Sequence, residues 1–304
     1  MCHDADIVYY DGVEWNQMEH DLTHEWLRGV WGSGSDDVYA VGDRGTILHY
    51  DGSVWSKMNS MTIDHLYAVW GTSRENIYAV GAAGTILHYD GVIWSDALES
   101  GPPDDLRAIW GRGSDDIYVA GGNGTILHYD GSDWLPMESQ TDAWILGLWG
   151  TSDNNIYGVG GYFDGVGKWL DPDAWNGGVI LHYDGMLWSE IKPDIPQRLF
   201  SIWGSSDSNI YAVGAQATIL HYADPAGDGS CILTNLYGEP SEQVALMRLF
   251  RDDRLAKTLL GRLAISAYYS LSPLLVKAIG EGEIARGALK ALIDTLLPWC
   301  PEKE

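Results

Sequence analysis

The dipeptide Trp-Gly recurs five times, and this repeat constrains the fold of the chain more than any other feature. Residues 106–134 show the full pattern, LRAIWGRGSDDIYVAGGNGTILHYDGSDW, which holds four short β-rich runs separated by Gly, Asp, Asn and Ser. A repeat of about 40 residues with four such runs is typical of one four-stranded propeller blade. A helical repeat is excluded, because the apolar residues alternate and many are β-branched. The dipeptides begin at Trp31, Trp70, Trp110, Trp149 and Trp203.

Charge divides the chain into two regions. Residues 231–304 hold nine basic and nine acidic residues, so the whole formal charge of −25 belongs to residues 1–230. A nucleic-acid-binding function is excluded, because contacts to phosphate need clustered Lys and Arg. The longest uncharged run after residue 230 spans 263–276, which is short of the about 20 apolar residues of a membrane-spanning helix. No signal-peptide pattern is visible in the first residues, MCHDADIVYY.

The first and last units of the repeat are incomplete in complementary ways. Residues 199–203, 209–213 and 218–222 match three inner strands, but no outer strand follows them, whereas residues 10–15 match a turn and an outer strand without inner strands. We therefore predict a five-bladed β-propeller over residues 1–223, closed by the N-terminal strand pairing with the last blade, which also removes a sheet edge. Residues 7–10 and 218–222 both match a third strand, so pairing of the N-terminal strand with a neighbouring molecule stays open.

The turn after the third strand carries the sequence H-Y-D-G-x-x-W at 49–55, 88–94, 128–134 and 182–188. With this turn the units resemble the Asp-box (BNR-like) propeller repeats, although the Ser or Thr that usually stands two residues before the aspartate is replaced by His. The resemblance covers roughly residues 7–222. It implies that the turn joins the third strand to the outermost one, so that 106–110, 116–120, 125–129 and the run from residue 134 are the four strands of one blade.

Strand order predicts which loops meet at each end of the propeller. The turns between first and second strands are nearly uniform, for example GSGSDD and GRGSDD, whereas the loops before the inner strands differ from unit to unit. Loops that depart from a repeat are where binding surfaces are usually built. We therefore expect a ligand to meet the varied loops, with Trp26, His65 and Trp144 as candidate contact residues.

The fourth unit carries about 15 additional residues in a second-to-third loop at this same end. Its carboxylates and indoles suit a glycan or polyol, or weakly an oxygen-ligated Ca²⁺ held by Asp171 and Asp173. Binding predicts that Trp169 and Trp175 are exposed, whereas an insertion that folds over its own blade would bury them. No other cofactor or metal is expected. The candidate ligand-binding residues of the insertion are Asp164, Trp169, Asp171, Asp173 and Trp175.

Histidine and tryptophan also recur at fixed positions. A third strand lies too far from the propeller axis for its histidines to converge on one metal ion, so the set is predicted to pack within the blades. The Trp-Gly tryptophans are predicted to interlock neighbouring blades, with ligand stacking as the alternative. A second tryptophan set, after the Asp-Gly turns, is predicted to lie in the core. The histidines are His49, His88, His128, His182 and His221, and the second tryptophan set is Trp15, Trp55, Trp94, Trp134 and Trp188.

The C-terminal part has a helical pattern. After a linker over 224–230, candidate helices over 241–249, 255–269 and 283–297 predict a small all-α domain over 231–304. Its sequences CILTNLYG (231–238), LFRD (249–252) and YYSLSP (268–273) resemble the CFI-box domain of bacterial repeat proteins, although the opening box is one residue short and lacks the usual Phe. This resemblance implies a bacterial source and a secreted or envelope setting. Cys231 and Cys300 could form a disulfide in an oxidising compartment, or remain two buried thiols.

The sequence favours a non-enzymatic, secreted or surface-exposed binding or adaptor protein. The inner strands LRGVW, LYAVW, LRAIW, ILGLW and LFSIW contain no acid that could act as a catalyst in the channel. The expected partner is a glycan or a protein, and the acidic surface favours a cationic one. The alternative is a structural subunit of an extracellular polymer, assembled by N-terminal strand exchange or through the C-terminal helices.

Overall fold

The computed structural model describes residues 6–18, 22–98, 101–163, 175–191 and 195–223, and the account below is confined to them. Contacts between residues divide the chain into two units, Met1–His221 and Tyr222–Glu304. Because the described residues end at 223, the predicted linker, the predicted helical domain and the Cys231–Cys300 pair lie outside them. None of the helices in the described part of the chain has the length and apolar character that crossing a membrane requires.

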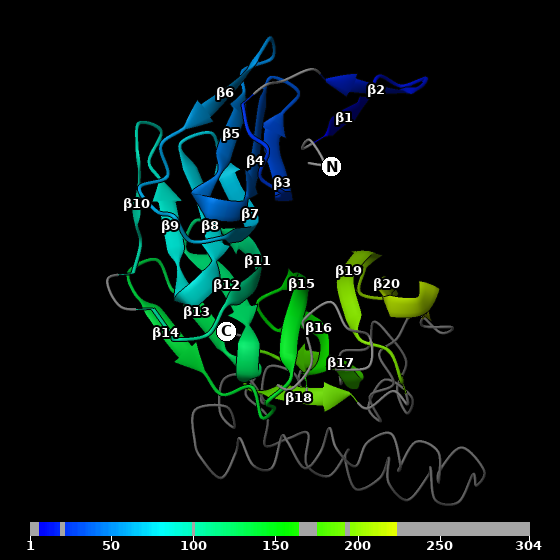
Figure 1. The fold of residues 1–304 in the computed structure, drawn as a ribbon. Coiled ribbons are helices and arrows are strands. Elements are labelled where there is room, and N and C mark those ends of the chain that lie inside the picture. The colour runs from blue at the N-terminus through cyan, green and yellow to red at the C-terminus, as the bar shows by residue number, and fades with distance from the viewer. Residues whose placement is uncertain (1–5, 19–21, 99–100, 164–174, 192–194, 224–304) are drawn as a thin grey trace, which may run out of the picture. The chain divides into compact units, whose positions relative to one another are not determined.

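The described chain is mainly β and forms repeated antiparallel four-stranded sheets in chain order (Figure 1). An N-terminal hairpin of β1 (Ile7–Tyr10) and β2 (Trp15–Met18) comes first. The first sheet is β3 (Leu27–Gly34), β4 (Asp37–Gly42), β5 (Ile47–Tyr50) and β6 (Trp55–Met58), and the second is β7 (Leu66–Ser73), β8 (Asn76–Gly81), β9 (Ile86–Tyr89) and β10 (Trp94–Asp96). The third sheet is β11 (Leu106–Gly113), β12 (Asp116–Gly121), β13 (Ile126–Tyr129) and β14 (Trp134–Met137). The fourth is β15 (Trp144–Ser152), β16 (Asn155–Phe163), β17 (Trp175–Tyr183) and β18 (Trp188–Ile191). The fifth has three strands, β19 (Leu199–Ser206), β20 (Asn209–Gly214) and β21 (Ile219–Ala223).

Strand order within each sheet follows the chain, as the repeat predicts. In the third sheet Trp110 pairs with Tyr118 across β11 and β12, and Tyr129 pairs with Trp134 across β13 and β14. The same positions pair in the other complete sheets, for example Trp31 with Tyr39 and Tyr50 with Trp55. A succession of such sheets, each connected by short turns, is the β-propeller architecture.

The Asp-Gly turn between third and fourth strands is built by local hydrogen bonds. The Asp51 carboxylate accepts the backbone N–H groups of Ser53 and Val54, each at 2.9 Å. Gly52 has a φ of +91°, a backbone conformation that side chains with a Cβ rarely adopt. The same aspartate and glycine pair recurs in the other turns, so one local signal terminates the third strand in every complete sheet.

The Trp-Gly dipeptides join neighbouring sheets, as the sequence predicts. A Cβ added to Gly111 in β11 would lie 2.5 Å from Cη2 of Trp70 in β7, so the indole of one sheet rests on the bare backbone of the next. Only glycine allows this approach. The same contact joins Trp31 to Gly71, Trp110 to Gly150 and Trp149 to Gly204.

Apolar side chains between successive sheets form the core. The inner strands pack in chain order, β3 against β7, β7 against β11, β11 against β15 and β15 against β19. Tyr39, Val41 and Ile47 of the first sheet, for example, are buried against Val69, Ile77 and Leu87 of the second. Because each sheet contributes two apolar faces, every sheet between two neighbours is covered on both sides.

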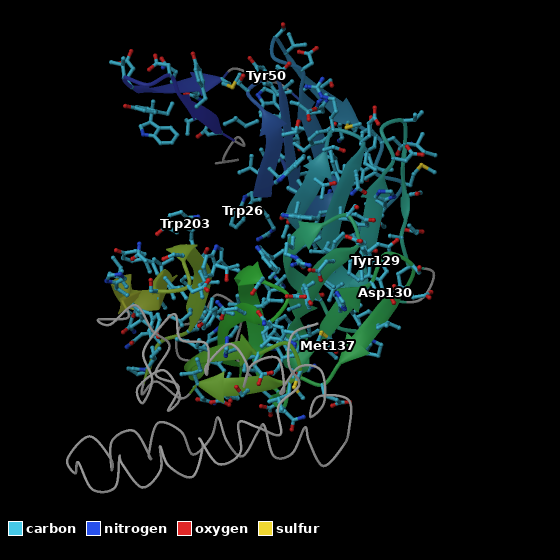
Figure 2. The ribbon with its side chains drawn as sticks, turned by 180° about the vertical axis from the view of Figure 1, so that it is seen from behind. Trp26, Tyr50, Tyr129, Asp130, Met137 and Trp203 are labelled. Carbon is cyan, nitrogen blue, oxygen red and sulfur yellow. The ribbon has the colours of Figure 1, made fainter. Side chains whose placement is uncertain are left out.

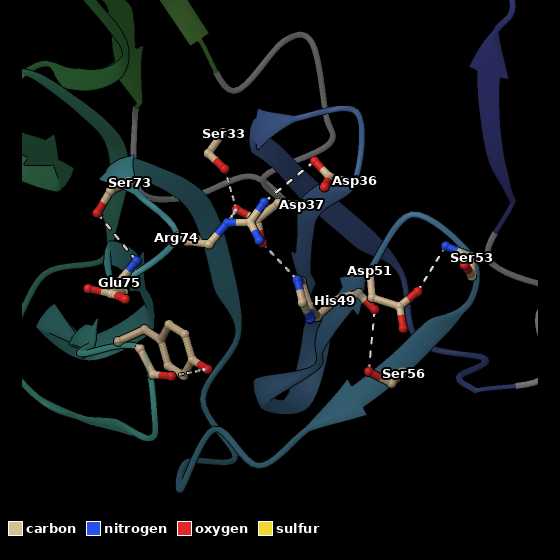
Figure 3. A network of polar contacts seen from close by, with 12 residues as sticks. Ser33, Asp36, Asp37, His49, Asp51, Ser53, Ser56, Ser73, Arg74 and Glu75 are labelled. Atoms are coloured by element: carbon tan, nitrogen blue, oxygen red, sulfur yellow. Dashed lines mark hydrogen bonds and ion pairs between the residues drawn. The ribbon is translucent and has the colours of Figure 1, made fainter.

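The repeated histidines are held inside their own sheets, as predicted. His49 stacks on Tyr39 with ring centroids 4.4 Å apart, and its Nε2 lies 2.9 Å from Oδ1 of Asp37 (Figure 3). Arg74 of the second sheet reaches the same Asp37 from the turn after β7, with its Nε 4.0 Å from Oδ2. This network ties two sheets together at the end where the uniform turns lie.

The predicted closure of a five-bladed ring by the N-terminal strand is wrong for the described residues. β2 pairs with β1 in a separate two-stranded sheet, while the fifth sheet keeps three strands. The physical reason is that β1 already occupies the third-strand position beside β2, and Tyr10 pairs with Trp15 as Tyr50 pairs with Trp55. The hairpin is therefore the outer half of a blade, formed locally.

One member of the second tryptophan set departs from the prediction of a core position. Trp94 and Trp188 are buried, whereas Trp15 is 69% exposed. The difference follows from the neighbours. Trp94 packs against Tyr39 of the preceding sheet at 6.4 Å between ring centroids. Trp15 begins β2 of the N-terminal hairpin, which no sheet precedes within the described residues.

Candidate binding site

A β-bulge near the start of each inner strand presents one side chain that takes no part in the regular pairing. In β3 the pairing shifts between Leu27 and Gly29, which leaves Arg28 as the extra residue. Bulges are known to redirect a side chain away from the face of its sheet. The equivalent residues in β7, β11, β15 and β19 are Tyr67, Arg107, Leu146 and Phe200.

Arginine and aromatic side chains alternate across these bulges. The Arg107 guanidinium lies 3.6 Å from the centre of the Tyr67 ring, and the Arg28 guanidinium lies 5.7 Å from the same ring. Trp26 and Trp144 extend the row, with Arg28 5.6 Å from the Trp26 ring and Arg107 5.6 Å from the Trp144 ring. All these distances fall within the range of cation–π attraction. We call Trp26, Arg28, Tyr67, Arg107 and Trp144 the arginine–aromatic belt.

Two carboxylates hold the belt in place. Asp43 accepts hydrogen bonds from Nε of Arg28 and, at 3.0 Å, from its second terminal nitrogen, a two-point contact that fixes the plane of the guanidinium. Asp105 accepts from the Arg107 guanidinium at 2.7 Å and from the Tyr67 hydroxyl at 3.2 Å. The belt is therefore ordered before any ligand arrives.

The pKa shifts of Asp43, Arg28 and Tyr67 favour the protonation states that their hydrogen bonds require. Partial burial by itself would raise the pKa of Asp43, but the hydrogen bond and charge of Arg28 outweigh it and lower that pKa below its ordinary value. The same hydrogen bond raises the pKa of Arg28. Burial raises the pKa of Tyr67, so its hydroxyl stays protonated and can donate to Asp105.

A hollow of about 250 Å³ lies beside the belt along the inner strands. Its polar wall is formed by Arg28, Tyr67 and Arg107, and its apolar wall by short or branched side chains of β3, β7, β11 and β15. The hollow is open and its exposed lining is more polar than apolar, so hydrogen bonds and stacking, more than apolar burial, would hold a ligand there.

Three predicted contact residues lie at this end of the sheets. Trp26 precedes β3 and is more than half exposed, and Figure 2 shows its indole standing out from the ribbon. Trp144 begins β15 and contacts Arg107. His65 lies next to the belt, with its Nδ1 3.1 Å from Oδ1 of Asp43. The structure thus brings Trp26, His65 and Trp144 to one end, as the loop argument expects.

The exposure of Trp175 that the ligand-binding interpretation of the insertion requires is wrong, and this indole is buried as the alternative expects. This indole is only 7% exposed, because it packs at 5.2 Å from the Phe163 ring and beneath the Arg198 guanidinium, 4.5 Å from its ring centre. The remaining candidate residues of the insertion, Asp164, Trp169, Asp171 and Asp173, lie outside the described residues, and so does the Ca²⁺ hypothesis built on Asp171 and Asp173.

Sequence reasoning missed Arg28, Tyr67 and Arg107. A signal was present in the aligned inner strands, where the second position reads Arg, Tyr, Arg, Leu and Phe while the first is Leu or Ile and the fifth is always Trp. A position that varies inside an otherwise constant strand indicates a side chain that does not pack against the neighbouring repeats. The bulge that exposes this position to the hollow is visible only in the strand register.

Comparison with known proteins supports the fold. No protein-family model matches the sequence, and no curated protein matches it. Among solved structures, YCF48 from Cyanidioschyzon merolae is similar with a TM-score of 0.54 and 15% identity over 72% of this chain and 77% of that one. Virginiamycin B lyase from Staphylococcus aureus has a TM-score of 0.53 and 12% identity over 72% and 77%. The extracellular domain of BT4673 from B. thetaiotaomicron has a TM-score of 0.53 and 14% identity over 72% of this chain and 30% of that one. At these identities the likeness shows a shared fold.

Proposed function

We propose that this chain is a non-enzymatic binding protein that receives an extended segment of a protein partner on the arginine–aromatic belt. The observation that carries the proposal is the row of alternating Arg and aromatic side chains along one hollow, with Arg107 3.6 Å above the Tyr67 ring. Trp, Tyr and Arg dominate the binding energy of protein interfaces, because each offers a large rigid surface together with hydrogen-bond donors.

The carboxylates next to the belt are each paired with an arginine, which supports binding rather than catalysis. Asp43 and Asp105 each hold an arginine, and the lowered pKa of Asp43 makes it unsuited to donate a proton near neutral pH. Asp104, the other acid next to β11, is bound to Asn123 at 2.6 Å and Thr125 at 3.2 Å. These acids are therefore engaged in contacts that hold the wall of the hollow, and a ligand there would be bound by hydrogen bonds and stacking.

The charge of the chain favours a partner of the opposite sign. A formal charge of −25 creates a field that attracts cationic proteins and accelerates their encounter, although it does not select the docked segment. Specificity would come from the belt, where peptide carbonyls can accept hydrogen bonds from the guanidinium groups that Tyr67 supports, and planar side chains can stack on the exposed Trp26 indole.

Peptide selection tests this proposal. A displayed peptide library is panned on the full chain, and enriched peptides are titrated by calorimetry against the wild type, Tyr67→Leu and Arg112→Ala. Leucine is chosen because Leu146 holds the equivalent bulge in β15. Arg112 serves as the control because it lies near the C-terminal end of β11, at the opposite end of the strand from the Arg107 bulge. Loss of a central interface aromatic costs about 2 kcal/mol or more, so Tyr67→Leu should weaken binding about 30-fold while Arg112→Ala leaves it unchanged.

Three results would count against the proposal. The first is that no peptide is enriched, and the second is that the enriched peptides bind Tyr67→Leu as tightly as the wild type. The third is that the chain binds sugars on a parallel glycan array but binds no peptide. Thermal unfolding of the variants is recorded first, so that loss of binding is compared only between folded proteins.

A further inference from the structure

The two ends of the row of sheets carry the two halves of the contact that joins every pair of neighbouring sheets. At each internal junction, a Trp-Gly tryptophan lies on the glycine of the next sheet. At the C-terminal end Trp203 is 60% exposed (Figure 2). At the N-terminal end, the three atoms nearest to a Cβ added at Gly32 belong to Asp37, Val38 and Gly34 of its own sheet. Among the described residues, one end thus presents the indole and the other the bare glycine.

The apolar faces around this contact are exposed in the same complementary way. Tyr39, Val41 and Ile47 are at most 2% exposed on the face of the first sheet that meets the second. Their equivalents on the fifth sheet, Tyr211, Val213 and Ile219, are 38%, 42% and 70% exposed.

The face of the first sheet that carries Gly32 is exposed, whereas the equivalent face of the second sheet is buried. Val69 of the second sheet is 7% exposed beneath the first sheet, whereas its equivalent in the first sheet, Val30, is 72% exposed. Val30 lies on the same side of β3 as Gly32, since the two are separated by two positions in an extended strand. The first sheet therefore presents an apolar face of the kind that the second, third, fourth and fifth sheets bury.

The N-terminal hairpin adds to this complementarity. The Trp55 indole N–H lies 3.4 Å from Sδ of Met18 in β2, and at the next junction Met58 packs in the cluster that contains Trp94. The hairpin thus stands where the outer half of a preceding blade would stand, without inner strands of its own. The fifth sheet has inner strands and no fourth strand.

We propose that the C-terminal face of one copy, β19–β20, docks on the N-terminal face of a second copy, β3–β4, beside its hairpin. The contact would repeat the internal junction, with Trp203 on Gly32 and Val30 covered by the fifth sheet. Because the two faces differ, the association is head-to-tail, and it continues from copy to copy unless a small ring closes. The fifth sheet of one copy and the hairpin of the next would together form one blade. Because β1 and β21 both hold the third-strand position, one of the two strands must leave that position when the blade forms.

Two end variants of the full chain test the proposal. Trp203→Arg blocks the C-terminal face and Val30→Arg blocks the N-terminal face, while Leu135→Arg, an exposed position on the outer strand β14, is the control. Mass is measured by sedimentation over a wide range of protein concentration. The wild type and Leu135→Arg should associate, and each end variant alone should have a dissociation constant raised about 30-fold or more.

Mixing the two end variants gives the decisive measurement. Each retains one intact face, so the mixture should form one-to-one dimers that grow no further, a result that also shows both variants to be folded. A wild type that stays monomeric at every concentration would overturn the proposal, because a closed ring or another segment of the chain would then cover the ends. Association that survives both arginine substitutions would overturn it equally.

Discussion

Placing a methyl group at an internal Trp-Gly junction should destabilise the protein, and Gly111→Ala makes this quantitative. The new Cβ would stand 2.5 Å from Cη2 and 2.9 Å from Cζ2 of Trp70. Carbon atoms pack best at roughly 3.5–4.0 Å, so the indole or the strand must move by about 1 Å. Trp70 is itself packed against the cluster that holds Leu106 and Ile117, which limits that movement.

The expected magnitude follows from overpacking of a close-packed interior. Such insertions cost about 1–3 kcal/mol, which lowers the Tm of a domain of this size by about 3–10 °C. Gly32→Ala is the matched control. Its Cβ would lie 2.9 Å from the Asp37 carbonyl oxygen, much as the Cβ at 111 lies 3.0 Å from that of Asp116, but its three nearest atoms include none of an indole. The difference between the two variants therefore isolates the contact between sheets.

Denaturant unfolding of the wild type, both variants and the double variant Trp70→Leu/Gly111→Ala provides the measurement. In the double variant the clash is gone, so its loss of unfolding free energy should be smaller than the sum of the two single losses by about 1 kcal/mol. Equal costs for Gly111→Ala and Gly32→Ala, or strict additivity with Trp70→Leu, would refute the interlocking role of the tryptophans. Concentrations at which the chain is monomeric are used, so that association through Gly32 does not enter.

Three further predictions concern the sheets themselves. Burial lowers the folded-state pKa of His88 and His182 below 6.5, so the unfolded chain binds more protons and stability should fall as pH drops below about 6.5; His182→Gln should flatten that part of a Tm-against-pH curve. The backbone N–H groups of Asp133 and Ser132 lower the pKa of Asp130 from its ordinary value of 3.8. Asp130→Ala should therefore reduce Tm at neutral pH by more than at pH 3, where the unfolded chain already binds a proton at this carboxyl group; an equal reduction at both pH values would contradict the ionic character of the turn. Trp188→Ala should cost about 3–5 kcal/mol in urea unfolding because its indole is buried, whereas Trp15→Ala, at an exposed indole, should cost less than about 1 kcal/mol.

The regular parts of the fold are predictable because their causes are local. Alternating apolar residues place one face of each strand in the core, and an Asp-Gly pair satisfies its own turn, so the strands of 106–137 follow from the residues between them. The histidine positions follow as well, since His128 bonds to Asp116 within its own sheet at 2.9 Å. The prediction failed at the N-terminus because two segments, β1 and β21, carry equivalent third-strand patterns, and periodicity cannot choose between them.

The candidate site was only partly predictable. The varied loops placed Trp26, His65 and Trp144 at one end of the sheets, where the structure has them. The binding interpretation of the insertion also required an exposed Trp175, which Arg198 and Phe163 cover. A run of residues shows which side chains can stack or form hydrogen bonds. It does not show which neighbouring segment will bury them.

By itself, the sequence determined a chain of repeated four-stranded sheets, their strand order and the Trp-Gly junctions, because each depends on residues within one repeat or on the same position in the next. Tertiary structure alone decided that Arg28, Tyr67 and Arg107 form one belt, since a bulge in each inner strand turns them toward a common hollow. It also decided that Trp203 and Val30 remain exposed. Burial of an apolar face depends on what packs against it, and the two end faces of this row have no neighbouring repeat within the described chain.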